Sequence, residues 1–65
     1  MSAATQVRLA NDVAAQFAHL PPDEAVAAVL AHLRSFWTPA MRSQLAAAAH
    51  DPGLSPLAAA VASAL

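Results

Sequence analysis

The 65-residue chain contains no cysteine, no lysine, no tyrosine and only one glycine. Without cysteine it can form neither a disulfide framework nor a thiolate metal site. With one glycine it cannot build the glycine-rich loop that cradles phosphate groups. The length allows one small domain, residues 1–65. Disulfide scaffolds, zinc modules with cysteine ligands and phosphate-binding loops are therefore excluded from the outset.

Charged residues are also scarce, at 11% of the chain. Three arginines and four acidic residues give a formal net charge of −1. Nucleic-acid-binding proteins usually concentrate basic residues on one face, so we expect no nucleic-acid partner. No uncharged apolar run reaches the ~18 residues of a membrane span, and the first residues lack the basic start and apolar core of a secretory signal. We therefore expect a cytoplasmic protein without membrane association.

Hydrophobic residues make up 58% of the chain, but twenty of the 65 residues are alanine. Alanine favours the helix and buries little area. The side chains large enough to build a core are fewer. We expect them to be Val7, Leu9, Val13, Phe17, Leu20, Val26, Val29, Leu30, Leu33, Phe36, Trp37, Met41, Leu45, Leu54, Leu57, Val61 and Leu65.

The energetic margin of such a chain is small. A 6.6 kDa chain buries ~5,700 Å² on folding. If two-thirds of that area is apolar, its burial contributes ~95 kcal/mol. Ordering the chain costs ~98 kcal/mol. Because the two terms nearly cancel, the chain gains much from a partner, which favours a small subunit over an independent enzyme.

Prolines divide the sequence into helical segments. We expect helices near residues 4–19, 23–36, 39–49 and 56–64. Thr38 and Ser55 each precede a proline, which is the signature of a helix cap followed by a first helical residue. Gly53 can adopt the positive φ that often ends a helix. No alternation typical of a strand appears, so the predicted fold class is all-α: a small bundle of three to four short helices separated by Pro-containing turns.

The first helical segment has two candidate inner faces. We expect the larger side chains to face the core, in a stripe formed by Leu9, Val13, Phe17 and Leu20. A second face carries small residues that would allow close approach of another helix, namely Val7, Asn11, Ala14 and Ala18. This second face is either an exposed alanine-rich surface or a seam against a partner.

The second segment has a broader apolar stripe, which consists of Val26, Val29, Leu30, Leu33, Phe36 and Trp37. At 100° per residue all six lie within about 60° of Leu33. The polar residues His32 and Arg34 flank the stripe. Aromatic edges with polar flanks are typical of a protein-binding helix, and equally of a small core that closes on itself.

No constellation of residues predicts catalysis or metal binding. The histidines stand at positions 19, 32 and 50, and no two of them are three or four residues apart. The four acidic residues fit helix-surface, first-turn and turn positions, so no general acid–base pair is predicted. No serine has the spaced partners of a triad. We expect no catalytic, cofactor-binding or metal-binding residue, and no enzymatic activity of the chain on its own.

The chemically distinctive residues concentrate instead in residues 32–42. The predicted partner-interface residues are Arg8, Asn11, His32, Arg34, Phe36, Trp37 and Arg42. Each has an alternative role that the sequence leaves open. Trp37 could belong to the core alone, or to a core that also contributes to an interface. The arginines could lie on a solvated helix face, and His32 could lie at a helix edge and form only local hydrogen bonds.

Three motifs resemble one protein family. Residues 7–11 read Val-Arg-Leu-Ala-Asn, and residues 53–57 contain a Gly-Leu-x-Pro-Leu segment. The central motif is a His, three residues, then Phe-Trp-x-Pro-x-Met-Arg, and it is complete from His32 to Arg42. Over about residues 6–65 the chain resembles the delta subunit of the soluble NAD-dependent, molybdenum-containing formate dehydrogenase.

This resemblance implies a non-catalytic accessory subunit that assembles with and stabilises a cytoplasmic complex, in which formate is oxidised to carbon dioxide and NAD is reduced. It implies docking on the large molybdopterin subunit. It further implies that the complex carries molybdopterin (bis-MGD), iron–sulfur clusters, FMN and NAD, and this chain none of them. Two alternatives remain open: a transient maturation or cofactor-insertion chaperone of that enzyme and, less favoured, a small helical nucleic-acid-binding module.

Overall fold

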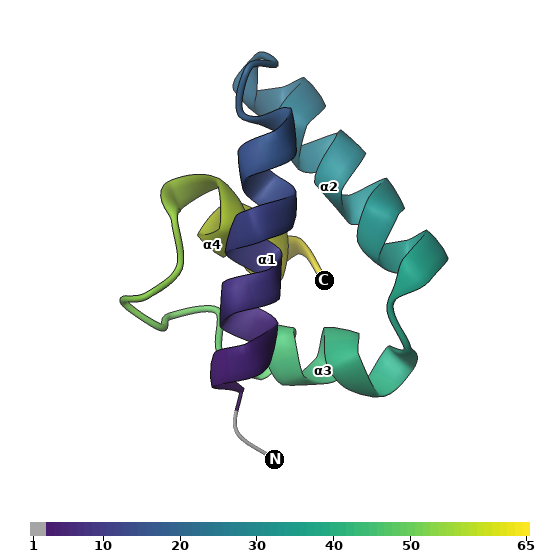
Figure 1. Ribbon diagram of the computed structural model, residues 1–65, viewed down its shortest axis with the longest axis vertical. Coiled ribbons are helices and arrows are strands. Elements are labelled where there is room, and N and C mark those ends of the chain that lie inside the picture. Colours follow the sequence, from purple (N-terminus) through teal and green to yellow (C-terminus); the bar gives the residue numbers. More distant parts are fainter. Residues whose placement is uncertain (1–2) are drawn as a thin grey trace.

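The computed structural model describes residues 3–65 and contains four helices there: α1 (Ala4–Phe17), α2 (Pro22–Phe36), α3 (Pro39–Ala47) and α4 (Pro56–Ala64). In Figure 1, α1 runs along the middle, α2 descends obliquely beside it, α3 lies across the lower end and α4 lies behind α1. The described residues contain no strand. The predicted all-α class is therefore confirmed.

Proline starts three of the helices, and two of these, α3 and α4, also have a side-chain cap. Pro22, Pro39 and Pro56 each occupy the first helical position. The Thr38 hydroxyl accepts a hydrogen bond from the Met41 backbone N–H at 3.2 Å. Ser55 does the same for the backbone N–H three residues further on, also at 3.2 Å. The two cap predictions are confirmed, because each depends only on a few neighbouring residues.

Two helices end earlier than expected. α1 stops at Phe17 and α3 at Ala47, each two residues short of the prediction. Beyond both ends the chain continues in tighter turns, in which an N–H bonds to the carbonyl three residues back. One such bond joins Leu20 N–H to the Phe17 carbonyl at 3.1 Å. Such turns provide hydrogen bonds for the last carbonyls of a helix. Their sequence pattern is close to that of the helix itself, so the helix end is hard to predict.

The core takes side chains from all four helices and from the loop before α4. It consists of Val7, Ala10, Val13, Ala14, Val29, Leu33, Leu45, Leu54, Ala58, Val61 and Ala62. Larger side chains that are half-buried against it are Phe17, Val26, Leu30, Trp37, Leu57 and Leu65. The alanines matter because a methyl group lets helix backbones approach closely. No helix within residues 3–65 combines the length and hydropathy required to cross a membrane.

The inner face of α1 differs from the prediction. Leu9 is 38% exposed and does not belong to the core. The buried residues of α1 are Gln6, Val7, Ala10, Val13 and Ala14. Their face lies between the two candidate stripes, about 90° from Leu9 on the helical wheel. α1 packs against all three other helices, and close packing favours the side with the small residues.

Phe36 also departs from the prediction. It was expected in the core, and its side chain is 74% exposed. α2 packs mainly against α1 and α4, and Figure 1 shows the axes of α1 and α2 diverging toward the end of α2. The helical wheel places Phe36 on the inner side of α2, but no helix lies opposite it at that level. The Phe36 side chain is therefore exposed because α1 and α2 diverge at this end of α2.

The loop between α3 and α4 is held by local polar contacts. The backbone N–H of Gly53 donates to the Asp51 carboxylate at 2.7 Å. Among residues 3–65 no residue has a positive φ, so the expectation for Gly53 was wrong. Space is the constraint instead. A Cβ at this position would lie 3.0 Å from Asp51 Oδ1 and 3.6 Å from Val7 Cγ1.

Candidate partner-binding surface

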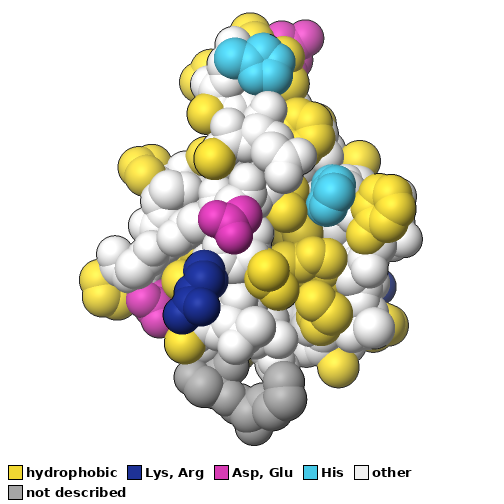
Figure 2. Space-filling view, viewed as in Figure 1, with side chains coloured by type: hydrophobic (Ala, Val, Ile, Leu, Met, Phe, Trp, Pro, Cys, Tyr) yellow, Lys and Arg dark blue, Asp and Glu magenta, His cyan; other side chains and the backbone are white. Residues whose placement is uncertain are grey.

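An aromatic cluster forms where α1 and α2 diverge. The His32 ring lies between two phenylalanines, with centroid distances of 6.5 Å to Phe17 and 4.8 Å to Phe36. The first contact is edge-to-face, with an interplanar angle of 62°. His32 thus contacts the ring of the exposed Phe36. On the face seen in Figure 2, hydrophobic side chains gather beside a histidine in this region.

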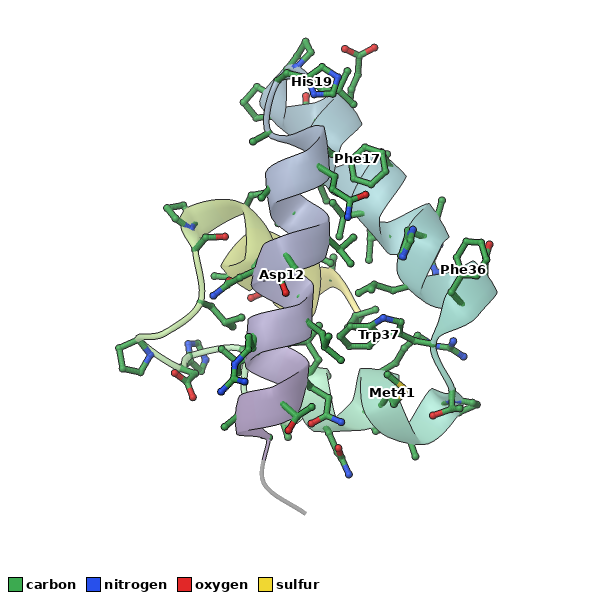
Figure 3. The ribbon with its side chains drawn as sticks, in the orientation of Figure 1. Asp12, Phe17, His19, Phe36, Trp37 and Met41 are labelled. Atoms are coloured by element: carbon green, nitrogen blue, oxygen red, sulfur yellow. The ribbon has the colours of Figure 1, made fainter. Side chains whose placement is uncertain are left out.

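Trp37 and Met41 line the junction between α2 and α3. Figure 3 shows the Trp37 ring turned toward α1, with Met41 beneath it, whereas Phe36 points away from the bundle. Trp37 and Met41 are both half-buried, and Trp37 packs against the core. Two consecutive aromatic residues therefore have different surroundings. Trp37 closes the core, and Phe36 presents an apolar ring to the outside.

Arg42 has a structural contact that sequence reasoning did not foresee. Its guanidinium Nη1 donates to the Trp37 carbonyl at 2.6 Å and to the Leu33 carbonyl at 3.2 Å. These carbonyls belong to the end of α2, where the helix leaves acceptors without intrahelical partners. Arg42 comes from the first turn of α3. It therefore ties the two helices together across the junction and is part-buried.

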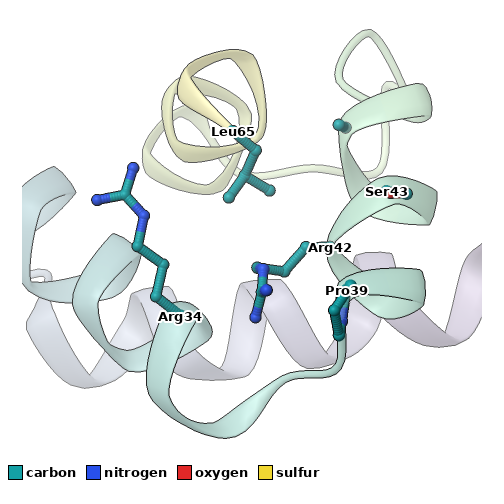
Figure 4. Close-up of a pocket in the computed structure, with 6 residues that line it drawn as sticks. Arg34, Pro39, Arg42, Ser43 and Leu65 are labelled. Carbon is teal, nitrogen blue, oxygen red and sulfur yellow. The ribbon is translucent and has the colours of Figure 1, made fainter.

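Arg34 and Arg42 line the same cavity. Its volume is about 360 Å³, and its other walls come from Pro39, Ser43, Ala46 and Leu65. In Figure 4 the two arginines approach from α2 and α3, and Leu65 projects toward the space between them. Arg34 is exposed. Within residues 3–65 it has no hydrogen-bond or ion-pair partner.

The other two predicted interface residues lie apart from these. Asn11 Nδ2 donates to the Gly53 carbonyl at 2.8 Å, and its Oδ1 accepts from the Ser55 N–H at 2.9 Å. Asn11 thus holds the α3–α4 loop, which Figure 1 shows on the other side of α1 from α2. Arg8 is exposed on α1 and, within residues 3–65, has no hydrogen-bond or ion-pair partner.

The second face that the sequence suggested for α1 is divided between core and surface. Val7 and Ala14 are buried in the core. Asn11 and Ala18 instead border a cavity of about 330 Å³ beside α4. The predicted interface residues therefore form two neighbouring groups near the α2–α3 junction and a separate pair on α1. They do not form one continuous surface.

Sequence reasoning missed two glutamines. Gln6 is only 3% exposed, and its Oε1 has no hydrogen-bond partner within residues 3–65. The same holds for Oε1 of Gln44 on α3. Each such buried acceptor costs about 1–3 kcal/mol. The signal for Gln6 was available in the sequence, because it precedes Ala10 by four residues and Val13 by seven, at the spacing of one helix face.

These surfaces define a small all-α protein with exposed aromatic and arginine side chains, which are typical of protein-binding modules. Within residues 3–65 no group of histidine and acidic side chains could hold a metal ion. The sequence matches the NADH-dependent formate dehydrogenase delta subunit family, FdsD, over residues 6–64. The chain therefore belongs to this family, as its motifs suggested, and is a subunit rather than a catalyst by itself. Neither a curated protein nor a solved structure gives a match.

Proposed function

We propose that the chain is a resident accessory subunit that assembles with and stabilises a cytoplasmic NAD-dependent formate dehydrogenase complex. In this proposal the aromatic side chains His32, Phe36 and Trp37, near the α2–α3 junction, dock on the large molybdopterin subunit. The complex oxidises formate to carbon dioxide and reduces NAD. The family match supports association with other subunits of such an enzyme. The choice of the large subunit as the docking partner is part of the proposal.

The exposure of Phe36 is the observation that carries this proposal. A phenylalanine that is 74% exposed leaves most of its ring in water, although burying it would contribute about 1.5–3 kcal/mol. The ring contacts His32 at a centroid distance of 4.8 Å, so a partner that covers Phe36 would also meet the His32 ring. Aromatic side chains of this kind dominate the binding energy of many interfaces.

The small core gives a second reason for a partner. Its largest fully buried side chains are only Leu33, Leu45, Val29 and Val61. A chain with so little buried volume is marginally stable alone. Anything that binds only the folded form adds to its stability by mass action. Assembly would therefore stabilise this chain as well as the complex.

The cofactors of the proposed complex belong to its other subunits. Molybdopterin (bis-MGD), iron–sulfur clusters, FMN and NAD are the expected set. Iron–sulfur clusters are held by thiolates, and this chain has no cysteine. Within residues 3–65 no cluster of histidine and acidic residues offers a metal site either. The residues of this chain thus do not fit a resident cofactor, and its contribution is to binding.

Affinity purification of a tagged copy tests the proposal. We expect formate dehydrogenase subunits to be recovered in a fixed ratio with the chain, together with formate-dependent NAD reduction. A maturation chaperone would instead be recovered with cofactor-free subunits and would be missing from the active complex. Recovery of the chain without any formate dehydrogenase subunit would refute the proposal.

The Phe36→Ala substitution tests the docking surface. We expect at least a tenfold loss of co-purifying subunits, whereas the helix content of the chain stays unchanged because Phe36 is outside the core. The matched control is Leu9→Ala, which removes an exposed apolar side chain from α1 and should leave assembly within twofold of wild type. Equal assembly of both variants would contradict a docking role for Phe36.

A further inference from the structure

The positive charge of this chain is concentrated around one cavity. It has only three arginines and no lysine, and Arg34 and Arg42 line the same cavity from two different helices. None of the four acidic residues lines it. Along α2, Glu24 lies ten residues before Arg34, ~15 Å along the helix axis, which exceeds the screening length of ~8 Å. No acidic side chain of this chain therefore lines the cavity beside the two arginines.

Backbone dipoles do not offset the charge of the two arginines either. The end of α2 contributes about half a negative charge, and Arg42 binds its carbonyls directly. The beginning of α3, at Pro39, contributes about half a positive charge on the same cavity. These two contributions roughly cancel, and the end of α4, at Leu65, adds about half a negative charge, which is small beside the two positive charges of the arginines. Within residues 3–65 neither arginine forms an ion pair.

Arg42 is already fixed in position. Its Nη1 atom donates to two carbonyls, at 2.6 and 3.2 Å, which leaves the Nη2 and Nε donors for another acceptor. Because the side chain is ordered before any ligand arrives, an anion that binds it loses less conformational entropy. A guanidinium group offers paired donors that match the two oxygens of a carboxylate.

We propose that this cavity binds a carboxylate side chain of an acidic segment on a partner subunit. The proposal rests on the proposed function and specifies the chemistry of the interface. The Arg34 and Arg42 guanidinium groups would pair with the carboxylate, and the exposed Ser43 hydroxyl stands at the same wall as a further donor.

The shape and walls of the cavity favour a carboxylate on a peptide over a free small anion. The volume of about 360 Å³ exceeds what a free one-carbon or two-carbon acid would fill, and leaves room for the peptide segment that carries the carboxylate. Leu65, Pro39 and Ala46 provide apolar walls, which suit the methylene groups of an aspartate or glutamate side chain. A small free carboxylate would leave those walls in contact with water.

Charge reversal in the co-expressed complex is the first test. We expect Arg34→Glu to lower the recovery of partner subunits at least tenfold. The control is Gln16→Glu, which adds a negative charge at an exposed position of α1, away from the cavity, and should stay within twofold of wild type. Wild-type recovery should also fall as salt is raised from 50 to 500 mM. Equal recovery of the two variants would overturn the proposal.

Cross-linking identifies the source of the carboxylate. Because the chain has no lysine, Arg34→Lys places its only side-chain amine at the cavity. A carbodiimide should then couple this amine to a carboxylate of a partner subunit, and mass spectrometry should locate the bond. Gln16→Lys, which places the only side-chain amine at an exposed position of α1 instead, is the control and should give at least tenfold less of this product. Coupling within the chain itself, or no coupling in an assembled complex, would contradict a partner carboxylate.

The outcomes separate this inference from the proposed function. If wild-type chain recovers no formate dehydrogenase subunit, the proposed function fails. If wild type assembles and Phe36→Ala does not, but Arg34→Glu assembles like Gln16→Glu, only the carboxylate site is wrong. Assembly of the wild-type chain that requires added 100 mM acetate would identify a small free anion as the ligand, and would also overturn the proposal.

Discussion

Replacement of Arg42 by alanine should destabilise the fold, although the residue looks like a surface arginine in the sequence. The substitution removes hydrogen bonds to the Trp37 and Leu33 carbonyls, at 2.6 and 3.2 Å. The Leu33 carbonyl keeps its bond from the Trp37 N–H at 2.9 Å. The main loss is therefore the short bond to Trp37.

The structure gives the magnitude of this effect. A hydrogen bond from a charged donor is worth about 1.5–3 kcal/mol, so Arg42→Ala should lower the free energy of unfolding by about 2 kcal/mol. For a 65-residue chain that corresponds to a fall in Tm of roughly 15 °C. Arg34→Ala removes an exposed side chain of the same type and should cost under ~0.5 kcal/mol.

Urea unfolding of the isolated chain, followed by circular dichroism at 222 nm, measures the difference between the two variants. Trimethylamine N-oxide in all samples raises the stability of a marginal chain into the measurable range. Arg42→Lys is a useful third variant, because it keeps the charge but cannot reproduce the guanidinium geometry, and it should lie between wild type and Arg42→Ala. Equal stability of Arg42→Ala and Arg34→Ala would refute the assigned role of Arg42.

Two further predictions concern the α3–α4 loop. Asn11→Ala should lower the free energy of unfolding by about 1–2 kcal/mol, because two hydrogen bonds to Gly53 and Ser55 are lost. Amide hydrogen exchange measures the effect: the Ser55 amide should exchange faster in the variant than in wild type, and an unchanged rate would contradict the prediction. Gly53→Ala should cost roughly 1 kcal/mol, because its Cβ would lie 3.0 Å from Asp51 Oδ1. In urea unfolding, an Asp51→Ala background should reduce that cost, and an equal cost in both backgrounds would show that the contact with Asp51 is not the cause.

The interface residues show what local pattern can and cannot resolve. The sequence indicated residues 32–42 as the distinctive region, and the structure places His32, Phe36 and the two arginines of this region near one helix junction. The sequence also predicted Asn11 at a partner surface, and this stays a prediction. What the sequence did not indicate is that Asn11 holds a loop 42 residues away. Contacts between distant segments have no signature in the spacing of neighbouring residues.

The sequence by itself determined the helices and their starts. Proline at a first helical position and a hydroxyl cap act within one turn, so Thr38 and Ser55 could be assigned without knowledge of the rest of the chain. Family membership was likewise readable from a motif confined to residues 32–42.

Only the tertiary structure decided which side of each helix is buried. Leu9 and Phe36 are exposed because burial depends on which helix lies opposite, and the divergence of α1 and α2 is a property of the whole packing arrangement. The same holds for Arg42, whose carbonyl partners become acceptors only when α3 folds back onto the end of α2. Helix propensity and capping are local in sequence, whereas burial and long-range hydrogen bonds require the assembled core.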